Sequence, residues 1–487
     1  MIYNAEVRWG FCFLRYNSYS FIKLQTKKSL GTKMLKSINP TTEEEIHIYN
    51  EMSETEVSKI ISASYNAFLN CRKTDFQTRA KYMKNAAKIL RSMKDRYAEL
   101  ITLEMGKPIN QSNAEVEKCA CVCEYYAAKA EIFLADEIIL TDATKSYVTY
   151  KPLGVILAIM PWNFPFWQVF RFAAPNLIAG NAGVLKHSSN VTGCALAIEE
   201  IFHKAGFPED MFRTLVVSSK TVKPIIENDN ISAVTLTGSV PAGKAVASMA
   251  GAVLKKTVLE LGGSDPYLIL EDADLEKASD ICVNSRLLNG GQSCIAAKRF
   301  IVVESIYKEF EKLFIQKMKA KKMGDPFNPE NDLGPQAKTD LRDELHKQVI
   351  KSIETGAKVL LGGEIPKSKG AFYPPTVLSN VVPGMPAYEE ELFGPVAAFI
   401  KVKDEEEGIR TANKTSFGLG AAVFTINAER GERIAKERLI AGCCFVNDFV
   451  KSDPRLPFGG VKESGFGREL SFFGIKEFVN IKTVYVK

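Results

Sequence analysis

Residues 153–160 read LGVILAIM and residues 161–165 read PWNFP, so an unbroken apolar run ends in a turn bounded by two prolines. An apolar run of this length, without alternating polar side chains, is typical of a strand buried on both faces of a sheet. Shorter runs of the same kind occur at residues 183–185, 215–217, 233–236, 257–259 and 266–270. We therefore expect a sheet made of buried strands.

Helical patterns separate these strands. They lie near residues 192–205, 219–228 and 241–250. Strands that alternate with helices indicate βαβ units and a parallel sheet covered by helices on both faces. After Gly262 and Gly263 the alternation starts again, with a helix from about Leu275, and it continues to about residue 440. The predicted fold class is therefore α/β, with two doubly wound parallel-sheet domains.

The segments on either side of these domains have patterns of their own. Ser53 and Glu56 form a capping-box pattern before a helix, and a second helical stripe of apolar residues runs from Tyr82 to Leu100. At the other end, residues 476–487 alternate loosely between apolar and polar side chains, which indicates an exposed strand. An exposed strand edge pairs readily with another chain, so we expect a homo-oligomer.

The composition is that of a globular protein, with 487 residues, 46% hydrophobic, 25% charged and a net charge of +6. It excludes a disordered chain, a collagen and a small secreted scaffold, and the length predicts two or three domains. Residues 1–33 hold six basic side chains and one acidic side chain. The other 454 residues carry about +1, so we expect no broad basic surface for nucleic acid or for a membrane.

Residues 1–33 form a basic, aromatic leader. They fit an organellar transit peptide, but the domain pattern begins directly after Met34, which favours translation from Met34. We expect a cytoplasmic protein, or an organellar one if the leader is a genuine transit peptide. Ten cysteines without a CxxC pair and only four histidines predict no metal site and a reducing compartment.

Three segments carry candidate catalytic residues. Residues 289–294, NGGQSC, place Cys294 directly after a glycine-containing turn, which suits a nucleophilic thiol. Glu260 ends a buried strand, where burial raises a carboxyl pKa toward the range of a general base. Asn163 lies just beyond the carboxyl end of the strand at residues 153–160, the end at which ligands bind in open α/β sheets. Its side-chain amide is suited to donate a hydrogen bond to an oxyanion. Each segment alone also fits a plain structural role, as a loop cysteine, a strand-end acid or an aromatic turn.

The motifs together resemble those of the aldehyde dehydrogenase superfamily. From about Ser37 onward they stand in that family's order: PWNFP, LELGG at 259–263, NGGQSC, ELFGP at 391–395 and PFGGVKESGFGRE at 457–469. The resemblance implies that Cys294 attacks an aldehyde and that Asn163 and the Cys294 backbone N–H hold the oxyanion. It also implies that Glu260 activates the water that hydrolyses the thioester.

The resemblance further implies a division into domains. We expect a cofactor-binding domain from residues 34–129 and 148–261 and a catalytic domain from residues 262–440. Residues 130–147 and 470–487 are expected to pair subunits in a dimer or a tetramer.

The resemblance also implies a set of residues that hold a nicotinamide dinucleotide. Lys186 reaches the adenosine ribose, Glu391 the nicotinamide ribose, and Phe393 flanks the ring. Gly238 and Ser239 meet the pyrophosphate at a helix N-terminus. The whole cofactor set is Trp162, Lys186, Ser189, Gly238, Ser239, Leu261, Glu391 and Phe393. No GxGxxG motif occurs, which argues against the usual Rossmann phosphate loop.

Ser189 departs from many NAD-dependent relatives, which carry Lys-Pro-Ser-Glu where residues 186–189 are Lys-His-Ser-Ser. A glutamate at residue 189 would repel a 2′-phosphate, so its replacement beside Lys186 makes NADP acceptable. We expect NADP or NAD as the cofactor, with NADP used at least as efficiently as NAD.

Two arginines are candidates for contact with the substrate. Arg171 follows Asn163 by eight residues, and a guanidinium on a helix there suits a carboxylate. Succinate-semialdehyde dehydrogenases of this family are similar at this position, but a second arginine that some of them carry is Leu288 here. Arg455 is a candidate replacement, with an ordinary salt bridge as the alternative.

The expected substrate is therefore succinate semialdehyde or a similar short ω-carboxy aldehyde. One alternative is a broad-specificity aliphatic or aromatic aldehyde dehydrogenase. Glu260, as a hydrolytic base, argues against relatives that pass the thioester to CoA. The remaining alternatives are a cysteine hydrolase without a cofactor and a non-catalytic structural protein.

Overall fold

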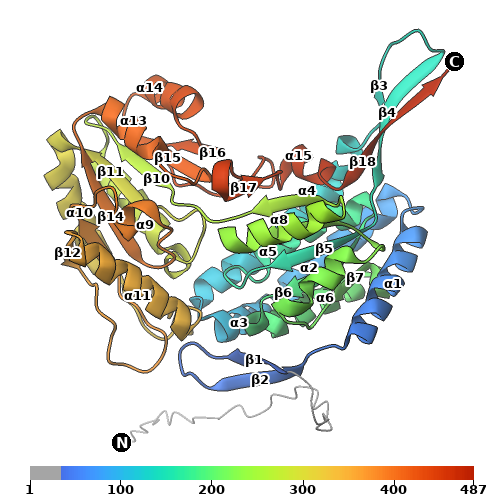
Figure 1. Cartoon of the computed structure of the whole chain (residues 1–487), viewed down its shortest axis with the longest axis horizontal. Helices are drawn as coiled ribbons and strands as arrows, with labels where there is room; N and C mark the ends of the chain where they lie inside the picture. Colours follow the sequence, from blue (N-terminus) through green and yellow to red (C-terminus); the bar gives the residue numbers. More distant parts are fainter. Residues whose placement is uncertain (1–33) are drawn as a thin grey trace, which may run out of the picture. The chain divides into compact units, whose positions relative to one another are not determined.

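The computed structural model describes residues 34–487, so both interpretations of the leader lie outside the described residues. In this part of the chain there are two large sheets, each flanked by helices, and two small sheets (Figure 1). The predicted α/β class with two doubly wound sheets is confirmed. None of the helices between residues 34 and 487 is long and apolar enough to cross a bilayer.

The first large sheet has six strands in the order β17-β9-β8-β5-β6-β7. Its parallel strands are β5 (Val155–Met160), β6 (Ala182–His187), β7 (Phe212–Thr214), β8 (Ile231–Thr237) and β9 (Lys256–Glu260). The short strand β17 (Gly465–Phe466) pairs antiparallel with β9. β5 lies inside the sheet with five of its six residues buried, as its apolar run predicts.

The strand predicted at residues 215–217 lies three residues earlier in the structure, as β7. The Leu215 N–H still donates to the Leu185 carbonyl at 2.8 Å, and the Val217 N–H then turns back to the Leu215 carbonyl at 3.0 Å. Leu215 and Val217 are buried. The apolar residues at 215–217 are therefore buried because they lie just beyond the end of the strand, not because they form it.

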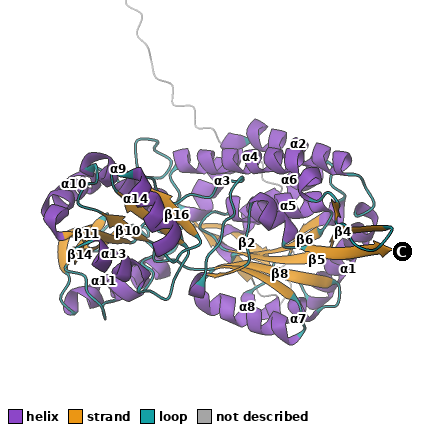
Figure 2. Cartoon of the chain, turned by 90° about the horizontal axis from the view of Figure 1, so that it is seen from above, coloured by secondary structure: helices purple, strands orange, loops and turns teal. Residues whose placement is uncertain are grey.

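Helices cover both faces of this sheet. Figure 2 shows α7 and α8 on one face and α2, α4, α5 and α6 on the other. The helices are α1 (Glu54–Cys71), α2 (Phe76–Ser92), α3 (Lys94–Met105), α4 (Ile109–Phe133), α5 (Trp167–Ala179), α6 (Thr192–Ala205), α7 (Val222–Glu227) and α8 (Val240–Ala252). The capping box of Ser53 and Glu56 is confirmed at the start of α1. The single stripe predicted from Tyr82 to Leu100 is split between α2 and α3, because Met93 leaves helical geometry (φ −119°, ψ 23°).

The second large sheet has seven strands in the order β12-β13-β14-β11-β10-β15-β16. All neighbouring strands in it are parallel except the pair of β12 with β13. The strands are β10 (Pro266–Ile269), β11 (Arg299–Val303), β12 (Lys358–Leu361), β13 (Thr376–Ser379), β14 (Val396–Val402), β15 (Gly420–Phe424) and β16 (Cys443–Val446). Its helices are α9 (Leu275–Leu287), α10 (Tyr307–Lys319), α11 (Thr339–Glu354), α12 (Pro386–Glu389), α13 (Glu405–Asn413) and α14 (Ala428–Arg433). β16 lies beyond residue 440, so this sheet extends past the expected end of the second domain.

A three-stranded antiparallel sheet forms an arm that projects from the first domain (Figure 1). It consists of β3 (Glu137–Ile138), β4 (Lys145–Pro152) and β18 (Val479–Val486), which confirms the predicted C-terminal strand. Residues 470–478 are not part of the arm, and α15 (Ser471–Lys476) lies against α4 and α5 instead. The hairpin of β1 (Met34–Ile38) and β2 (Glu45–Asn50) has no counterpart among the elements expected from the sequence.

Candidate active site

The loop that carries Cys294 is held in an unusual backbone conformation. It begins with a 3₁₀ turn (Leu288–Gly291) after α9, in which Asn289, Gly290 and Gly291 have φ angles of 57°, 60° and 76°. Left-handed backbone costs glycine little, and asparagine tolerates it better than most residues. A Cβ at Gly291 would lie 2.2 Å from the Gly394 carbonyl oxygen, so only glycine lets the ELFGP segment pack this closely. The loop leaves Cys294 partly exposed.

Asn163 lies directly beside this loop, at the carboxyl end of β5. Its Nδ2 donates to the Gln292 carbonyl at 3.1 Å, and Asn289 Nδ2 donates to the Asn163 carbonyl at 2.7 Å. Asn163 is buried, and its amide therefore stays within reach of the residues that flank Cys294. This arrangement brings together two of the three predicted catalytic residues.

Lys298 joins the cysteine loop to Glu391 and was not found by sequence reasoning. Its Nζ donates to the carbonyls of Ser293 at 3.0 Å and Cys294 at 2.7 Å, and it lies 3.6 Å from Glu391. Glu391 also accepts from the Gly263 N–H at 3.0 Å. The only feature of the sequence that marks Lys298 is its place just before a buried strand, where a charged side chain needs partners.

Although part of the Cys294 residue is exposed, the protein around its thiol removes it from water, and this desolvation raises its pKa to about 12. The positive charges of Arg171 and Lys298 act in the opposite direction. The resting thiol is therefore protonated at neutral pH, and formation of the thiolate requires a base or a further positive charge near the sulfur.

Glu260, at the end of β9, has a strongly raised pKa. Burial is the main cause, and the neighbouring Glu469 carboxylate adds to it, while Arg171 opposes it. Within residues 34–487 neither carboxyl oxygen of Glu260 has a hydrogen-bond partner, although the side chain is only 2% exposed. Such an orphaned carboxyl group is suited to exchange a proton with a bound water.

Both arginines predicted for the substrate already have a carboxylate partner. Arg171, on α5, is buried, forms an ion pair with Glu469, and lies 4.8 Å from the centre of the Phe458 ring. Its Nη2 also donates to Thr237 Oγ1 at 3.3 Å. Arg455 is exposed and pairs with Asp453 at 2.6 Å. Arg171 thus lies in the catalytic region, whereas the local pair holds Arg455 at the surface.

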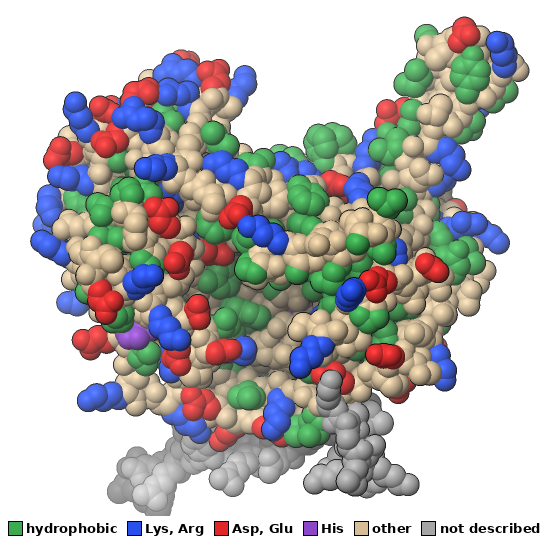
Figure 3. Space-filling model, viewed as in Figure 1, with side chains coloured by type: hydrophobic (Ala, Val, Ile, Leu, Met, Phe, Trp, Pro, Cys, Tyr) green, Lys and Arg blue, Asp and Glu red, His purple; other side chains and the backbone are tan. Residues whose placement is uncertain are grey.

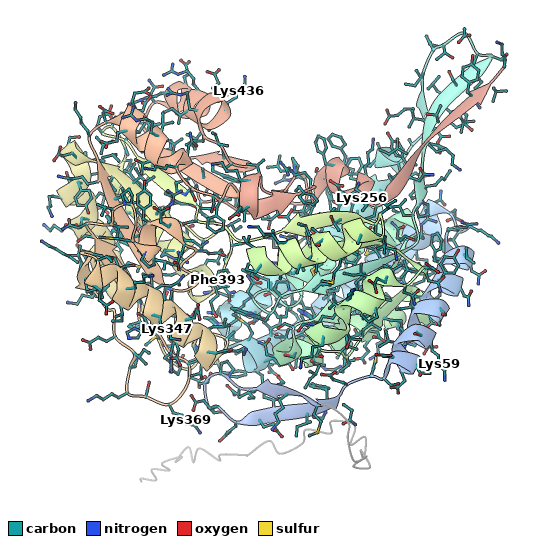
Figure 4. The ribbon with its side chains drawn as sticks, in the orientation of Figure 1. Lys59, Lys256, Lys347, Lys369, Phe393 and Lys436 are labelled. Atoms are coloured by element: carbon teal, nitrogen blue, oxygen red, sulfur yellow. The ribbon has the colours of Figure 1, made fainter. Side chains whose placement is uncertain are left out.

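The residues predicted for the nicotinamide end of a cofactor lie together. The rings of Trp162 and Phe393 meet edge to face with centroids 5.7 Å apart, and Figure 4 shows Phe393 between the two sheet domains. A Cβ at Gly262 would lie 2.4 Å from Glu391 Oε2, so a glycine here leaves room for that carboxylate. These residues form a cradle of aromatic and acidic groups that fits a nicotinamide riboside.

The residues predicted for the phosphate end lie at the edges of β6, β8 and β9. Ser239 caps α8 without a side-chain hydrogen bond to it, and Gly238 donates to the Glu260 carbonyl at 3.0 Å. Lys186 is partly buried at the end of β6, and burial lowers its pKa. Ser189, two residues beyond the end of β6, is exposed. The N-terminus of α8, which Ser239 leaves without a side-chain cap, fits a pyrophosphate.

Leu261, the last residue of the predicted cofactor set, has a packing role. Its side chain fills the place where a Cβ at Gly243 would lie, at 2.5 Å, and its N–H donates to the Ser464 carbonyl at 3.1 Å. It therefore fixes α8 against the end of β9, and so positions the helix N-terminus.

A buried ion pair supports the PWNFP turn from behind and was also missed in the sequence. Lys107 and Glu115 pair with almost no exposure, and Lys107 Nζ lies 3.9 Å from the centre of the Phe164 ring. Glu115 Oε1 accepts from the N–H groups of Phe166 and Trp167, each at 2.9 Å. The pair therefore fixes both the turn and the start of α5.

His187 holds the same turn from the opposite side. Its Nε2 lies 2.9 Å from the Pro165 carbonyl, and its Nδ1 lies 2.9 Å from the Ser188 nitrogen and 3.1 Å from the Met160 carbonyl. A neutral ring with its proton on Nε2 donates to Pro165 and accepts from the Ser188 N–H. Burial lowers the pKa of His187 to about 4, so the imidazole stays neutral at physiological pH and keeps this pattern. Histidine at this position therefore fixes the turn that presents Asn163.

Glu115→Gln should destabilise the protein by about 3 kcal/mol or more, because it leaves the Lys107 ammonium buried without a counter-charge. The free energy of unfolding in denaturant measures this loss. The double variant Lys107→Met/Glu115→Gln is expected to recover much of it, since it removes the unpaired charge. A loss of less than about 0.5 kcal/mol in Glu115→Gln would contradict this role of the pair.

Comparison with known proteins gives a consistent result. The model of the aldehyde dehydrogenase family matches residues 26–484. A probable succinate-semialdehyde dehydrogenase [NADP(+)] from Synechocystis sp. is 50% identical over 92% of this chain and 99% of its own length. The succinate semialdehyde dehydrogenase [NAD(P)+] Sad from Escherichia coli is 48% identical over 92% of this chain and 97% of its own.

Solved structures agree as well. The succinic semialdehyde dehydrogenase from Streptococcus pyogenes, in complex with NADP+, superimposes with a TM-score of 0.91 at 38% identity, over 93% of this chain and 99% of its own. Gox0499, whose structure concerns cofactor and substrate selection, superimposes with a TM-score of 0.92 at 37% identity, over 93% and 100%. The chain belongs to the aldehyde dehydrogenase family.

Proposed function

We propose that this protein oxidises succinate semialdehyde to succinate and reduces NADP or NAD. The observation that carries the proposal is the contact of the Asn163 turn, the Cys294 loop and Glu391 at one place between the two sheets. The names of the relatives that are 46–50% identical support the aldehyde and the cofactor.

The chemistry follows from the residues in this place. The Cys294 thiol loses its proton to solvent, and the thiolate attacks the aldehyde carbon; the oxygen that becomes negative is held by Asn163 Nδ2–H and the Cys294 backbone N–H. When this oxygen re-forms its double bond to carbon, the carbon gives up a hydride and becomes a thioester of Cys294. A bound nicotinamide dinucleotide supplies an acceptor for the hydride. Glu260 then takes a proton from water, whose oxygen attacks the thioester, and the carboxylic acid leaves as the Cys294 sulfur is released.

The substrate is tested by the formation of reduced cofactor over a panel of aldehydes with NADP. The proposed function predicts a kcat/KM for succinate semialdehyde well above that for butanal, which has the same chain length without the carboxylate. Equal values for the two would favour the broad-specificity alternative. No reduced cofactor with any aldehyde would favour a hydrolase or a structural protein.

Ser189→Glu should lower kcat/KM for NADP by about tenfold or more, because unit charges 4 Å apart repel by about 1 kcal/mol in water and about 4 kcal/mol near a protein surface. Steady-state kinetics with NADP and NAD measure the change in preference. Ser189→Gln is the matched control, since it has the same size without the charge. A wild-type enzyme with a strong preference for NAD would contradict the proposed role of Ser189.

The arm is proposed to pair with a second copy of the chain in a dimer or tetramer. Ile138, Leu140 and Ile481 are 63%, 95% and 62% exposed, and Figure 3 shows hydrophobic side chains on the arm. Exposed apolar strands of this kind are normally covered by a partner. Sedimentation of the purified protein tests this assembly, and a monomer would contradict it.

A further inference from the structure

We infer that Lys298 is a positioning residue for the oxyanion site: it orients the peptide between Ser293 and Cys294 so that the Cys294 N–H is presented to the reacting oxygen. The inference rests on the proposed function, which gives this N–H a role but does not explain what holds its direction. The observation behind it is a set of three hydrogen bonds from Lys298 to the loop that carries Cys294.

The backbone of Lys298 is anchored in the second large sheet, directly before β11. Its N–H donates to the Asp265 carbonyl at 3.1 Å, and its carbonyl accepts from the Ala398 N–H at 3.0 Å. Asp265 directly precedes β10 and Ala398 belongs to β14, so the strands on both sides of β11 hold this residue. The side chain therefore starts from a rigid element, as a group that positions another group must.

The Lys298 ammonium directs all of its donors at the cysteine loop. An ammonium has three N–H groups. Nζ lies 3.0 Å from the Ser293 carbonyl oxygen, 2.7 Å from that of Cys294 and 3.1 Å from that of Ala296. The nearest oxygen of Glu391 is farther away, at 3.6 Å, and the lysine side chain is only 1% exposed. Three carbonyl oxygens that converge in a buried place need a donor between them, and a single ammonium supplies it.

The bond to the Ser293 carbonyl fixes the direction of the Cys294 N–H. The two groups belong to one planar trans peptide, so they point in opposite directions. A Ser293 carbonyl held toward Lys298 therefore holds the Cys294 N–H on the side away from Lys298. The Ala296 N–H also donates to the Ser293 carbonyl, at 3.2 Å. Within residues 34–487 no acceptor takes the Cys294 N–H, which leaves it for a ligand oxygen.

The sequence of the loop explains why it needs an external tie. Gly290 and Gly291 precede the cysteine with φ angles of 60° and 76°, and glycine has more conformational freedom than any other residue. Arg286 Nη2 fixes the first part of the loop by donating to the Gly291 carbonyl at 2.7 Å. Lys298 fixes the part that contains the cysteine. Without its ammonium, the peptide before the cysteine keeps one weaker tie, and its N–H turns more easily away from the substrate oxygen.

Two reactions of the Cys294 thiol separate this role from others in the purified enzyme without NADP. Acylation by 4-nitrophenyl acetate joins the sulfur to the carbonyl carbon, moves an electron pair onto the carbonyl oxygen as an oxyanion, and then expels 4-nitrophenolate. Alkylation by iodoacetamide joins the sulfur to the CH₂ carbon as iodide leaves, and no oxyanion forms. Both reactions need the thiolate, so a change in the thiol pKa slows both. A misdirected oxyanion donor slows only the acylation.

Lys298→Met removes the three donors and keeps the length of the side chain. The rate of acylation, measured by release of 4-nitrophenolate, is expected to fall roughly 10- to 100-fold more than the rate of alkylation, measured on the mass of the Cys294 peptide. Asn163→Ala, which removes the other oxyanion donor, should show the same pattern. Lys298→Gln keeps an amide donor one bond shorter and should recover part of the acylation. Lys312→Met, at an exposed lysine on α10, is the matched control and should react as the wild type.

Aldehyde oxidation gives a further readout in the same variants. At saturating NADP, Lys298→Met should lower kcat/KM for succinate semialdehyde and for butanal by the same factor, because the reacting oxygen is common to both. The affinity for NADP should stay within about threefold of the wild type. A variant whose only defect is weaker binding of NADP would show that Lys298 acts through Glu391, and it would overturn the inference.

The outcomes separate this inference from the proposed function. If Lys298→Met melts at the wild-type temperature and slows acylation and alkylation equally, Lys298 acts only on the charge of the thiol, and the inference is wrong. If Lys298→Met does not fold, the same two rates in Lys298→Gln decide. A wild type that is not acylated at Cys294 would contradict the oxyanion site and the inference with it. A wild type that is acylated there but oxidises no succinate semialdehyde would overturn the proposed function and leave the assignment of Lys298 to the ratio of the two rates.

Discussion

The Cys294→Ser variant is expected to lose aldehyde oxidation almost completely, with kcat lowered by about 10⁴-fold or more. A serine hydroxyl has a much higher pKa than a thiol, so its anion is far harder to form, and the neutral hydroxyl is a far weaker nucleophile than a thiolate. The measurement is the rate at which reduced NADP appears with succinate semialdehyde.

Cofactor binding separates loss of chemistry from loss of structure in this variant. The affinity for NADP should stay within about threefold of the wild type, since serine preserves the backbone of the loop. Cys121→Ser is the matched control, because Cys121 is exposed on α4 and lies outside the catalytic groups. A Cys294→Ser enzyme with a tenth or more of the wild-type kcat would show that another group is the nucleophile.

The Glu260→Gln variant is expected to complete the first half of the reaction and then stop. Reduced cofactor should form rapidly to about one equivalent per active site, followed by a steady rate roughly 10²- to 10⁴-fold below that of the wild type. The reason is that glutamine cannot take the proton from the water that attacks the thioester. Rapid-mixing absorbance of the reduced cofactor separates the two phases.

The direction in which the thioester hydrolysis rate changes with pH also follows from Glu260. Burial and the Glu469 charge raise the pKa of Glu260, so its basic form appears only as the pH rises. The thioester hydrolysis rate of the wild type should therefore increase with pH, and Glu260→Gln should lose that increase. Glu406→Gln, at the exposed pair with Arg438, is the control that should behave as the wild type. Loss of the initial phase in Glu260→Gln would place this carboxyl group in the first half of the reaction instead.

The parts of the site that the sequence predicted are those tied to strand ends and glycine turns. Asn163 directly follows a strand that its apolar run predicts, and Gly290 and Gly291 predict a tight turn before Cys294. Ligands of parallel sheets bind at the carboxyl ends of the strands, so both segments were expected at that edge of the sheet. The resemblance to a family added Glu391 and Phe393, which no local pattern would have marked. In the structure Asn163 contacts the Cys294 loop, Glu391 accepts from the Gly263 N–H, and Phe393 packs on Trp162.

Residues that act through long-range contacts were invisible in the sequence. Lys298, Lys107 and Glu115 look like ordinary charged residues until folding buries them against carbonyls, rings and helix ends. The same reason limited the interpretation of Arg171, since its partner Glu469 lies far along the chain. The strand predicted at residues 215–217 was misplaced because these apolar residues are buried just beyond the end of β7.

The most direct test of the proposed mechanism is the intact mass of Glu260→Gln after mixing with succinate semialdehyde and NADP. We expect one added succinyl group per chain, located on the peptide that contains Cys294, and no adduct with this thioester mass when NADP is left out. A thioester formed without NADP, a succinyl group on another residue, or rapid turnover without any adduct would contradict oxidation through a Cys294 thioester.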